Sequence, residues 1–302
     1  MLVFKPDFSD SNLPPHVYMD ELPSFYNVPY AFAYEYKSYY YAFSPDIGAL
    51  KPFVQPKRNE TLEEWIKKIF FATDIRPALY PPGQFFLRMW RPPGYLPREQ
   101  LTPNIKVLMQ SSIAVELLIQ RMQDLFITVE PERKNLSVFG HRIRELLLLA
   151  CMEVEAAWTG VLKEHNFIKK RYSTNYYVKL LEPMCLADYE VTLRWYPDFP
   201  CFKPFACWND RRPTQSLYWY DAYNKTKHDR ETNLQNATLV HAIHAVGGAV
   251  VMFCAQFGIP QGERLTQSIY SMFNVYLVND RPERAYIPLN GDEWTPTQYN
   301  FN

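Results

Sequence analysis

The sequence predicts a mainly α protein: a helical bundle with a small β-hairpin insertion and an aromatic, proline-rich N-terminal extension. Apolar residues recur at helical intervals over residues 104–128 and again over residues 139–164. A third stretch, residues 233–257, is apolar nearly all round, which is typical of a central, buried helix. Together these patterns indicate a bundle of long helices that pack on one another.

Residues 1–103 are expected to form the N-terminal extension, with one short helix. Aromatic residues alternate over residues 30–36, which favours a strand or a wrapping arm. The tyrosines either pack on their own domain or face a partner, because tyrosine has one apolar and one polar end. Thr61 and Glu64 have the spacing of a capping box and predict a helix start. The proline-rich remainder is expected to be irregular, apart from a short strand near Phe85.

Residues 104–302 are expected to form the bundle domain. The short connection between its first two long helices predicts an antiparallel helical hairpin. Over residues 175–196 the hydrophobic period changes to that of a strand, which predicts the β-hairpin insertion. Gly247 and Gly248, in the middle of the apolar helix, predict the close approach of a neighbouring helix. A further helix is expected over residues 263–277.

The composition excludes several function classes. Lysine plus arginine number 32, as do aspartate plus glutamate. A protein that coats nucleic acid usually carries a basic excess, so only a local basic patch is compatible with this balance. The chain has 10 glycines and no G-x-G pair. The glycine-rich phosphate loops of common nucleotide enzymes are therefore absent, and no cofactor is expected.

The cysteines and the N-terminus indicate a cytoplasmic protein. The 5 cysteines are odd in number and have no CxxC spacing, so neither a disulfide framework nor a zinc site is expected. We expect buried or half-buried thiols in a reducing compartment. Acidic residues and prolines stand where a signal peptide needs an apolar run, and no apolar stretch has the length of a membrane span. No membrane partner is expected.

A polar stretch at residues 223–230 is the most informative part of the chain. Asn224 and His228 are four positions apart, so on a helix they share one face. An imidazole near neutral pH is a natural general base. The nearby cations could stabilise negative charge on a phosphate; they are Lys225, Lys227 and Arg230. The alternative is a solvated helix start, held by Lys225–Asp229 and Lys227–Glu231 ion pairs.

Two other sets of polar residues invite a functional interpretation. Glu153 falls on the apolar stripe of its helix, so it needs either a structural hydrogen bond or a role in orienting His228 or a cation. Glu155 lies off that stripe and is expected to be solvated. His241 and His244 have a spacing that suits metal ligands, but no third ligand is near in sequence. They are expected to be core histidines, and no metal site is predicted.

Residues 104–258 resemble the HEPN superfamily, which comprises four-helix bundles of prokaryotic toxins, phage-defence effectors and CRISPR ribonucleases. Two features carry the resemblance: residues 144–150 with Glu153 in one helix, and Asn224 and His228 in another. The active motif of the family is an arginine, usually a polar residue, and then a histidine. Asn224 and His228 match the last two, whereas the place of the arginine is taken by Tyr223, or by Ala222 or Asp221 with longer spacing.

The resemblance implies a metal-independent endoribonuclease of an antiviral defence or toxin–antitoxin system, with RNA as substrate. His228 would be the base or acid, Asn224 would orient the phosphate, and Arg230 or Lys227 would replace the missing arginine. Lys225 and Lys227 would bind substrate, while Tyr223 and Glu153 would support the site. The alternative is a non-catalytic scaffold that forms a homodimer or binds a partner protein, with the tyrosine-rich arm as its surface. A small-molecule site in the proline-rich middle has no sequence feature in its favour.

Overall fold

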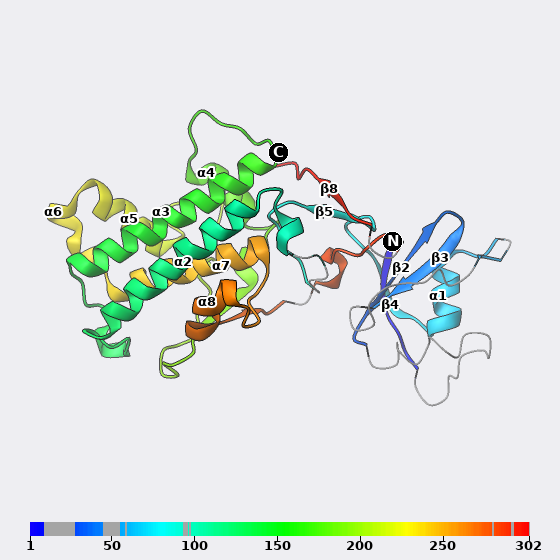
Figure 1. The fold of residues 1–302 in the computed structure, drawn as a ribbon, viewed down its shortest axis with the longest axis horizontal. Helices are drawn as coiled ribbons and strands as arrows, with labels where there is room; N and C mark the ends of the chain where they lie inside the picture. The colour runs from blue at the N-terminus through cyan, green and yellow to red at the C-terminus, as the bar shows by residue number, and fades with distance from the viewer. Residues whose placement is uncertain are drawn as a thin grey trace. The chain divides into compact units, whose positions relative to one another are not determined.

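The computed structural model in Figure 1 describes residues 1–8, 28–44, 55–57, 59–92, 96, 98–279, 281–290 and 293–301. The chain divides into two compact units. Unit 1 comprises residues 1–86, 91–97 and 280–297, and unit 2 comprises residues 87–90, 98–279 and 298–302. The structure is 46% helical and 16% strand and contains a multi-strand antiparallel sheet. The prediction of a mainly α bundle is therefore wrong, and the fold is mixed α/β.

Unit 1 contains the sheet that the sequence did not predict. Its four strands have the order β3-β2-β1-β4 and pair antiparallel throughout. They are β1 (Leu2–Lys5), β2 (Ala31–Tyr36), β3 (Tyr39–Phe43) and β4 (Thr73–Pro77). Lys37 and Ser38, both with left-handed φ angles (48° and 64°), form the two-residue turn between β2 and β3. What the sequence indicated as an extension is thus a folded unit.

Helix α1 (Leu62–Phe70) covers one face of this sheet. Thr61 caps it with both hydrogen bonds of a capping box, as predicted. On the other face, Tyr34 and Tyr41 pack with Ile287 from the last part of the chain. The Tyr34 hydroxyl donates to the Pro288 carbonyl at 3.1 Å. Tyr34 and Tyr41 therefore pack on their own domain, whereas Tyr39 of the same strand pair is exposed.

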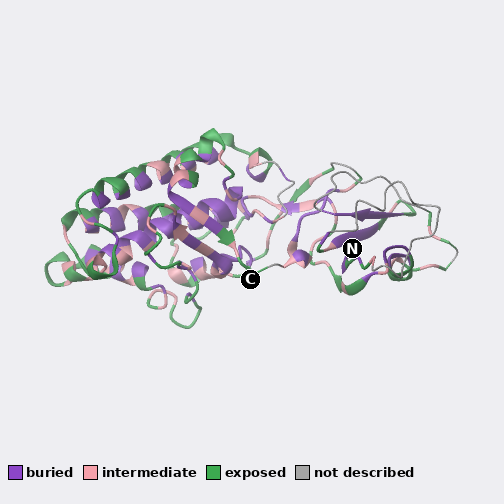
Figure 2. Cartoon of the chain, turned by 90° about the horizontal axis from the view of Figure 1, so that it is seen from below, coloured by how far each residue is buried: buried purple, intermediate pink, exposed green. Residues whose placement is uncertain are grey.

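Unit 2 is built on three long helices that contact one another: α2 (Ile105–Phe126), α3 (His141–Glu164) and α7 (Leu239–Phe257). The predicted helices at residues 104–128 and 139–164 are confirmed. Figure 2 shows the helices purple, hence buried, on their inner faces and green on their outer faces. Every residue of α7 from Ala245 onward is buried, as expected for a central helix. A side chain at Gly248 would meet the Trp219 ring at 3.1 Å, so this glycine allows a neighbouring helix to approach closely.

Helix α7 is also long and apolar enough to cross a membrane, judged by length and composition alone. However, 89% of that apolar window is buried inside the protein. A core helix has the same composition, so packing accounts for the apolar sequence of α7.

The predicted β-hairpin at residues 175–196 is wrong. Its first half is helical, with α4 at Thr174–Tyr177 and a 3₁₀ turn at Val178–Leu180. Only β6 (Tyr189–Leu193) is a strand, and it pairs antiparallel with β7 (Phe273–Leu277). Helix α8 (Gln267–Met272) is correspondingly shorter than predicted, because the chain becomes extended at Phe273. The alternating pattern was correct for β6, but its partner strand is distant in sequence.

Each of the two units is built from several separate segments of the chain. The Arg88 amide donates to the Leu101 carbonyl at 2.5 Å and the Trp90 amide to the Ala255 carbonyl at 2.9 Å, which holds residues 87–90 in unit 2. In unit 1, β5 (Gln84–Phe86) pairs in parallel with β8 (Thr295–Thr297). The boundaries of the two units therefore differ from the single boundary expected at residue 103.

Candidate functional site

The polar stretch lies at the junction of two helices. Helix α5 (Tyr218–His228) packs against α3 and α7, and α6 (Arg230–Asn233) follows at once. Asp229 lies between them and caps α6, since its carboxylate accepts a hydrogen bond from the Thr232 amide at 3.2 Å. His228 is therefore the last residue of α5, and Arg230 is the first residue of the next helix.

Asn224 and His228 lie one helical turn apart on α5. The half-buried Asn224 amide donates to the Tyr220 carbonyl at 3.0 Å, which leaves its side-chain oxygen to accept from a ligand. The His228 side chain is exposed, and no hydrogen-bond or ion-pair partner for its imidazole lies among the described residues. An exposed imidazole at a helix end can reach a bound substrate without displacing a protein partner.

Arg144 of α3 brings a guanidinium to this end of α5. Its Nε and Nη2 donate to the Thr226 carbonyl at 3.2 Å and 2.9 Å. Thr226 precedes His228 by two positions, and carbonyls at a helix C-terminus favour a cation. Arg144 therefore places a guanidinium against the last turn of α5. Sequence reasoning did not identify Arg144 as a site residue, because it lies 82 positions from Thr226.

The two lysines of the motif make different contacts from those expected. Lys225 pairs with Asp221 at 2.7 Å rather than with Asp229, which is occupied in capping α6. The Lys227 ammonium donates to the Tyr223 hydroxyl at 2.8 Å and lies 4.9 Å from the centre of that ring. The predicted Lys225–Asp229 and Lys227–Glu231 pairs are therefore wrong, because the helix ends before they can form.

The end of α5 and the start of α3 carry several cationic or titratable side chains, which we together call the basic end. Its exposed or half-buried members are His141, Arg142, Arg144, Lys227, His228 and Arg230. The acids close to it in sequence include Asp229, which caps α6, and Glu145, which pairs with Arg121 at 2.9 Å. Glu231 is exposed. The chain has no net charge, so this local excess of cations is compatible with a phosphate backbone.

The carboxylate beside α5 is Glu155 rather than Glu153. The Tyr220 hydroxyl donates to Glu155 at 2.5 Å, and burial together with this carboxylate raises the pKa of both Tyr220 and Tyr223. The expectation that Glu155 is solvated is wrong, because the face of α3 that meets α5 runs through Cys151 and Glu155. Glu153 lines a cavity between α2, α3 and α7, so the structure does not bring it together with His228.

The two histidines of α7 are hydrogen-bonded within unit 2. His241 Nδ1 lies 2.6 Å from the Asn236 carbonyl, and His244 Nδ1 contacts the Tyr218 hydroxyl. Burial lowers the pKa of His244 to about 3. In the described part of the chain, no group of three or more His, Cys, Asp or Glu side chains is placed to hold a metal ion. The contacts of His241 and His244 fit the interpretation of both as structural histidines.

The cysteines divide by burial. Cys151, Cys185 and Cys254 are buried, as expected, whereas Cys201 and Cys207 are exposed free thiols. The expectation of buried or half-buried thiols is wrong for these two, which lie in the irregular segment before α5.

In comparisons with known proteins, no family model, no curated protein and no solved structure matches this chain.

Proposed function

We propose that unit 2 is a HEPN-like endoribonuclease of a prokaryotic defence or toxin system, with its active site at the basic end. The observation that carries the proposal is that Arg144 of α3 binds the Thr226 carbonyl, two residues before His228 at the C-terminus of α5. The side-chain oxygen of Asn224 is one turn away. Metal-independent cleavage of RNA can use a general base together with a hydrogen-bond donor or cation that stabilises the charged phosphate.

The chemistry follows from these positions. Neutral His228 takes the proton of a ribose 2′-hydroxyl, and the resulting 2′-oxygen attacks the neighbouring phosphorus. The bond from phosphorus to the 5′-oxygen breaks, and that oxygen takes a proton from the His228 imidazolium as it leaves. The products are a 2′,3′-cyclic phosphate and a 5′-hydroxyl. Arg144, with Arg230 or Lys227, stabilises the negative charge that builds up on the phosphate oxygens.

The test uses the full-length chain with end-labelled structured and single-stranded RNAs in EDTA. Cleavage that leaves 2′,3′-cyclic phosphate ends supports the proposal. Absence of cleavage contradicts it, as does cleavage that persists unchanged when either His228 or Arg144 is replaced.

Replacing Arg144 with methionine should lower the rate of the chemical step by about 10- to 100-fold, since it removes charge stabilisation in the transition state. Arg142 is the matched control, because it is exposed two residues earlier on α3. Arg142→Met should weaken RNA binding and leave the single-turnover rate at saturation near that of the wild type. Single-turnover kinetics with a thermal melt of each variant separate these outcomes. Equal single-turnover rates for wild type and Arg144→Met would remove Arg144 from the site.

A second candidate function is supported by an apolar stripe on α2. Ile105, Met109, Ile113 and Leu117 recur every fourth residue and are 45–55% exposed. Beside them, Leu149 of α3 lines a shallow groove together with Ile113 and Leu117. A contiguous exposed apolar surface of this kind marks a protein interface. We propose that the stripe packs against the same stripe of a second copy, which suits a dimeric ribonuclease and equally a non-catalytic scaffold.

Replacing Ile113 with aspartate is expected to convert a dimer into a monomer, because a charge would be buried at the centre of the apolar interface. Ile127→Asp is the control, since Ile127 is 86% exposed and lies beyond the stripe at the end of α2. Sedimentation velocity measures the mass of each variant. A monomeric wild type, or a dimer that persists in Ile113→Asp, would exclude this interface.

A further inference from the structure

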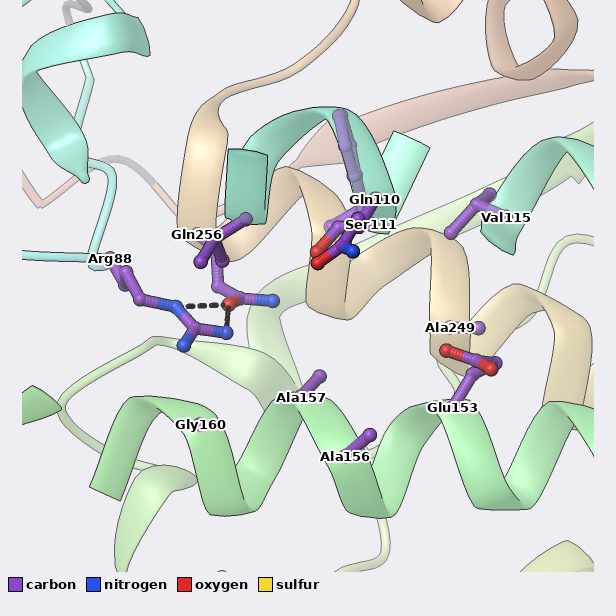
Figure 3. Close-up of a pocket in the computed structure, with 12 residues that line it drawn as sticks. Arg88, Gln110, Ser111, Val115, Glu153, Ala156, Ala157, Gly160, Ala249 and Gln256 are labelled. Carbon is purple, nitrogen blue, oxygen red and sulfur yellow. Dashed lines mark hydrogen bonds between the residues drawn. The ribbon is translucent and has the colours of Figure 1, made fainter. Parts of the chain in front are cut away.

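A cavity of about 290 Å³ lies between α2, α3 and α7, on a different face of α3 from Glu155. Figure 3 shows Arg88 and Gln256 at one end and Glu153 at the other. Between these ends the wall is mixed: the polar side chains of Gln110 and Ser111 lie opposite the apolar Ala156, Ala157 and Ala249. This size and lining suit a small elongated molecule with polar groups at both ends.

Arg88 is held in place by an unusual set of contacts. Arg88 is only 7% exposed, and its backbone has a left-handed φ of 54°. Its Nε and Nη2 both donate to Gln256 Oε1, at 2.9 Å and 2.5 Å. Gln256 is itself fixed, because its Nε2 donates to the Met252 carbonyl at 2.8 Å. The left-handed backbone of Arg88 belongs to a turn, and the contacts with Gln256 fix the position of its guanidinium.

Gly160 of α3 makes room for the guanidinium. A Cβ at this position would lie 2.5 Å from Arg88 Nη1 and 2.7 Å from Nη2. Any larger residue would push the guanidinium away from the helix. The glycine and Gln256 together therefore define one orientation of Arg88 at the end of the cavity.

Arg88 has no carboxylate partner within 4.0 Å among the described residues, although Glu164 acts on it at longer range. Burial lowers its pKa to about 10. Arg98 of the same unit provides a contrast: it donates to the carbonyls of Phe257 and Ile259 and pairs with Glu263 at 3.3 Å. The contacts of Arg98 are those of a structural arginine. A buried cation with one neutral acceptor and no close anion instead indicates an anionic ligand.

Glu153 defines the opposite end of the cavity. It precedes Gly160 by seven residues on α3, which corresponds to about 10 Å along the helix. Its carboxylate points across the cavity toward Ala249 in Figure 3. Within the described residues no hydrogen-bond donor satisfies it, and partial burial raises its pKa. This end therefore suits a hydrogen-bond donor.

We propose that the cavity binds a small aliphatic carboxylate with a hydrogen-bond donor, an ammonium or a hydroxyl, at its far end. The planar guanidinium of Arg88 binds the carboxylate. The aliphatic chain lies along Ala156 and Ala157, and the terminal donor reaches Glu153. This site uses none of the residues of the basic end, but it shares Gln110 and Glu153 with the groove beside the α2 stripe.

Isothermal titration calorimetry of the full-length chain tests the site with 6-aminohexanoate, hexanoate and inorganic phosphate. We expect 6-aminohexanoate to bind at least tenfold more tightly than hexanoate, because only the former has a donor for Glu153. Arg88→Met should weaken binding of both carboxylates at least tenfold. Glu153→Gln should remove the preference for 6-aminohexanoate, whereas Glu145→Gln, on the same helix and outside the cavity, should retain it.

Three results would overturn the proposal: no binding of either carboxylate to wild type, unchanged affinity in a folded Arg88→Met, or an unchanged preference in Glu153→Gln. Tighter binding of phosphate than of both carboxylates would also overturn the assignment to a carboxylate. Thermal melts report whether each variant folds. Because Glu153 is exposed, Glu153→Gln is expected to fold. The preference of this variant for 6-aminohexanoate over hexanoate therefore tests the proposal even where Arg88→Met does not fold.

Discussion

Replacing His228 with alanine is expected to reduce the rate of RNA cleavage by about 10²- to 10⁴-fold, the usual contribution of a general base. The imidazole is exposed at the end of α5, so its loss should change the free energy of unfolding by no more than about 0.5 kcal/mol. The loss of activity would then reflect chemistry rather than unfolding. Rates of appearance of the 2′,3′-cyclic phosphate, with a thermal melt of each protein, measure both quantities.

His141→Ala is the matched control for this experiment. His141 is an exposed histidine at the first position of α3, within the same basic end. Its replacement should lower RNA affinity slightly and leave the cleavage rate at saturation unchanged. A similar loss in both variants would point to nonspecific RNA binding, and activity retained in His228→Ala would exclude His228 as the base.

The same experiment separates the two candidate functions. A ribonuclease loses cleavage with His228→Ala and remains a dimer, because the stripe on α2 is unaffected. A scaffold shows no cleavage in the wild type and loses its association only with Ile113→Asp. The apolar stripe therefore does not by itself decide between them, whereas the behaviour of His228 does.

Local patterns in the sequence predicted the helices but not the sheet. The capping box at Thr61 and the periodic helices α2 and α3 depend on residues within a few turns of one another. The sheet depends on distant pairing: Leu2 of β1 lies opposite both Ala33 and Pro77. Nothing local to β1 identifies these partners. The aromatic alternation therefore indicated strands without indicating that they close into a separate unit.

The same limit applies to the candidate sites. Asn224 and His228 could be identified because they lie one turn apart on one helix. Arg144 and Arg88 could not, since their partners Thr226 and Gln256 are 82 and 168 positions away. A sequence can suggest which residue types a site contains, but distant residues are brought together only by the packing of α3 against α5 and α7.

Stability of unit 2 is expected to fall as the pH is lowered from about 7 to about 4, and the buried His165 contributes to this fall. His165 is 4% exposed at the end of α3, where its Nδ1 accepts a hydrogen bond from the Tyr299 amide at 3.2 Å. Burial lowers its pKa from 6.5 to about 4. The folded state therefore disfavours the charged imidazole.

The sign of the effect follows from proton binding. Between pH 6.5 and about 4 the unfolded chain binds a proton at His165 that the folded chain does not, so acid favours unfolding. The stabilisation is complete above pH 6.5 and is lost as the pH falls toward 4. The difference between the two pKa values corresponds to about 3 kcal/mol. His244, whose pKa is also lowered by burial, acts in the same direction.

Urea unfolding at a series of pH values should show this dependence directly. His165→Gln keeps an acceptor for the Tyr299 amide and removes the titrating ring, so its unfolding free energy should decline less steeply between pH 7 and pH 4. His141→Gln, an exposed histidine on the same helix, tests for the loss of a histidine as such. Parallel curves for wild type and His165→Gln would show that the acid sensitivity of unit 2 comes from other groups. A less steep decline of the unfolding free energy in His165→Gln would show that protonation of His165, at the end of α3, contributes to unfolding by acid.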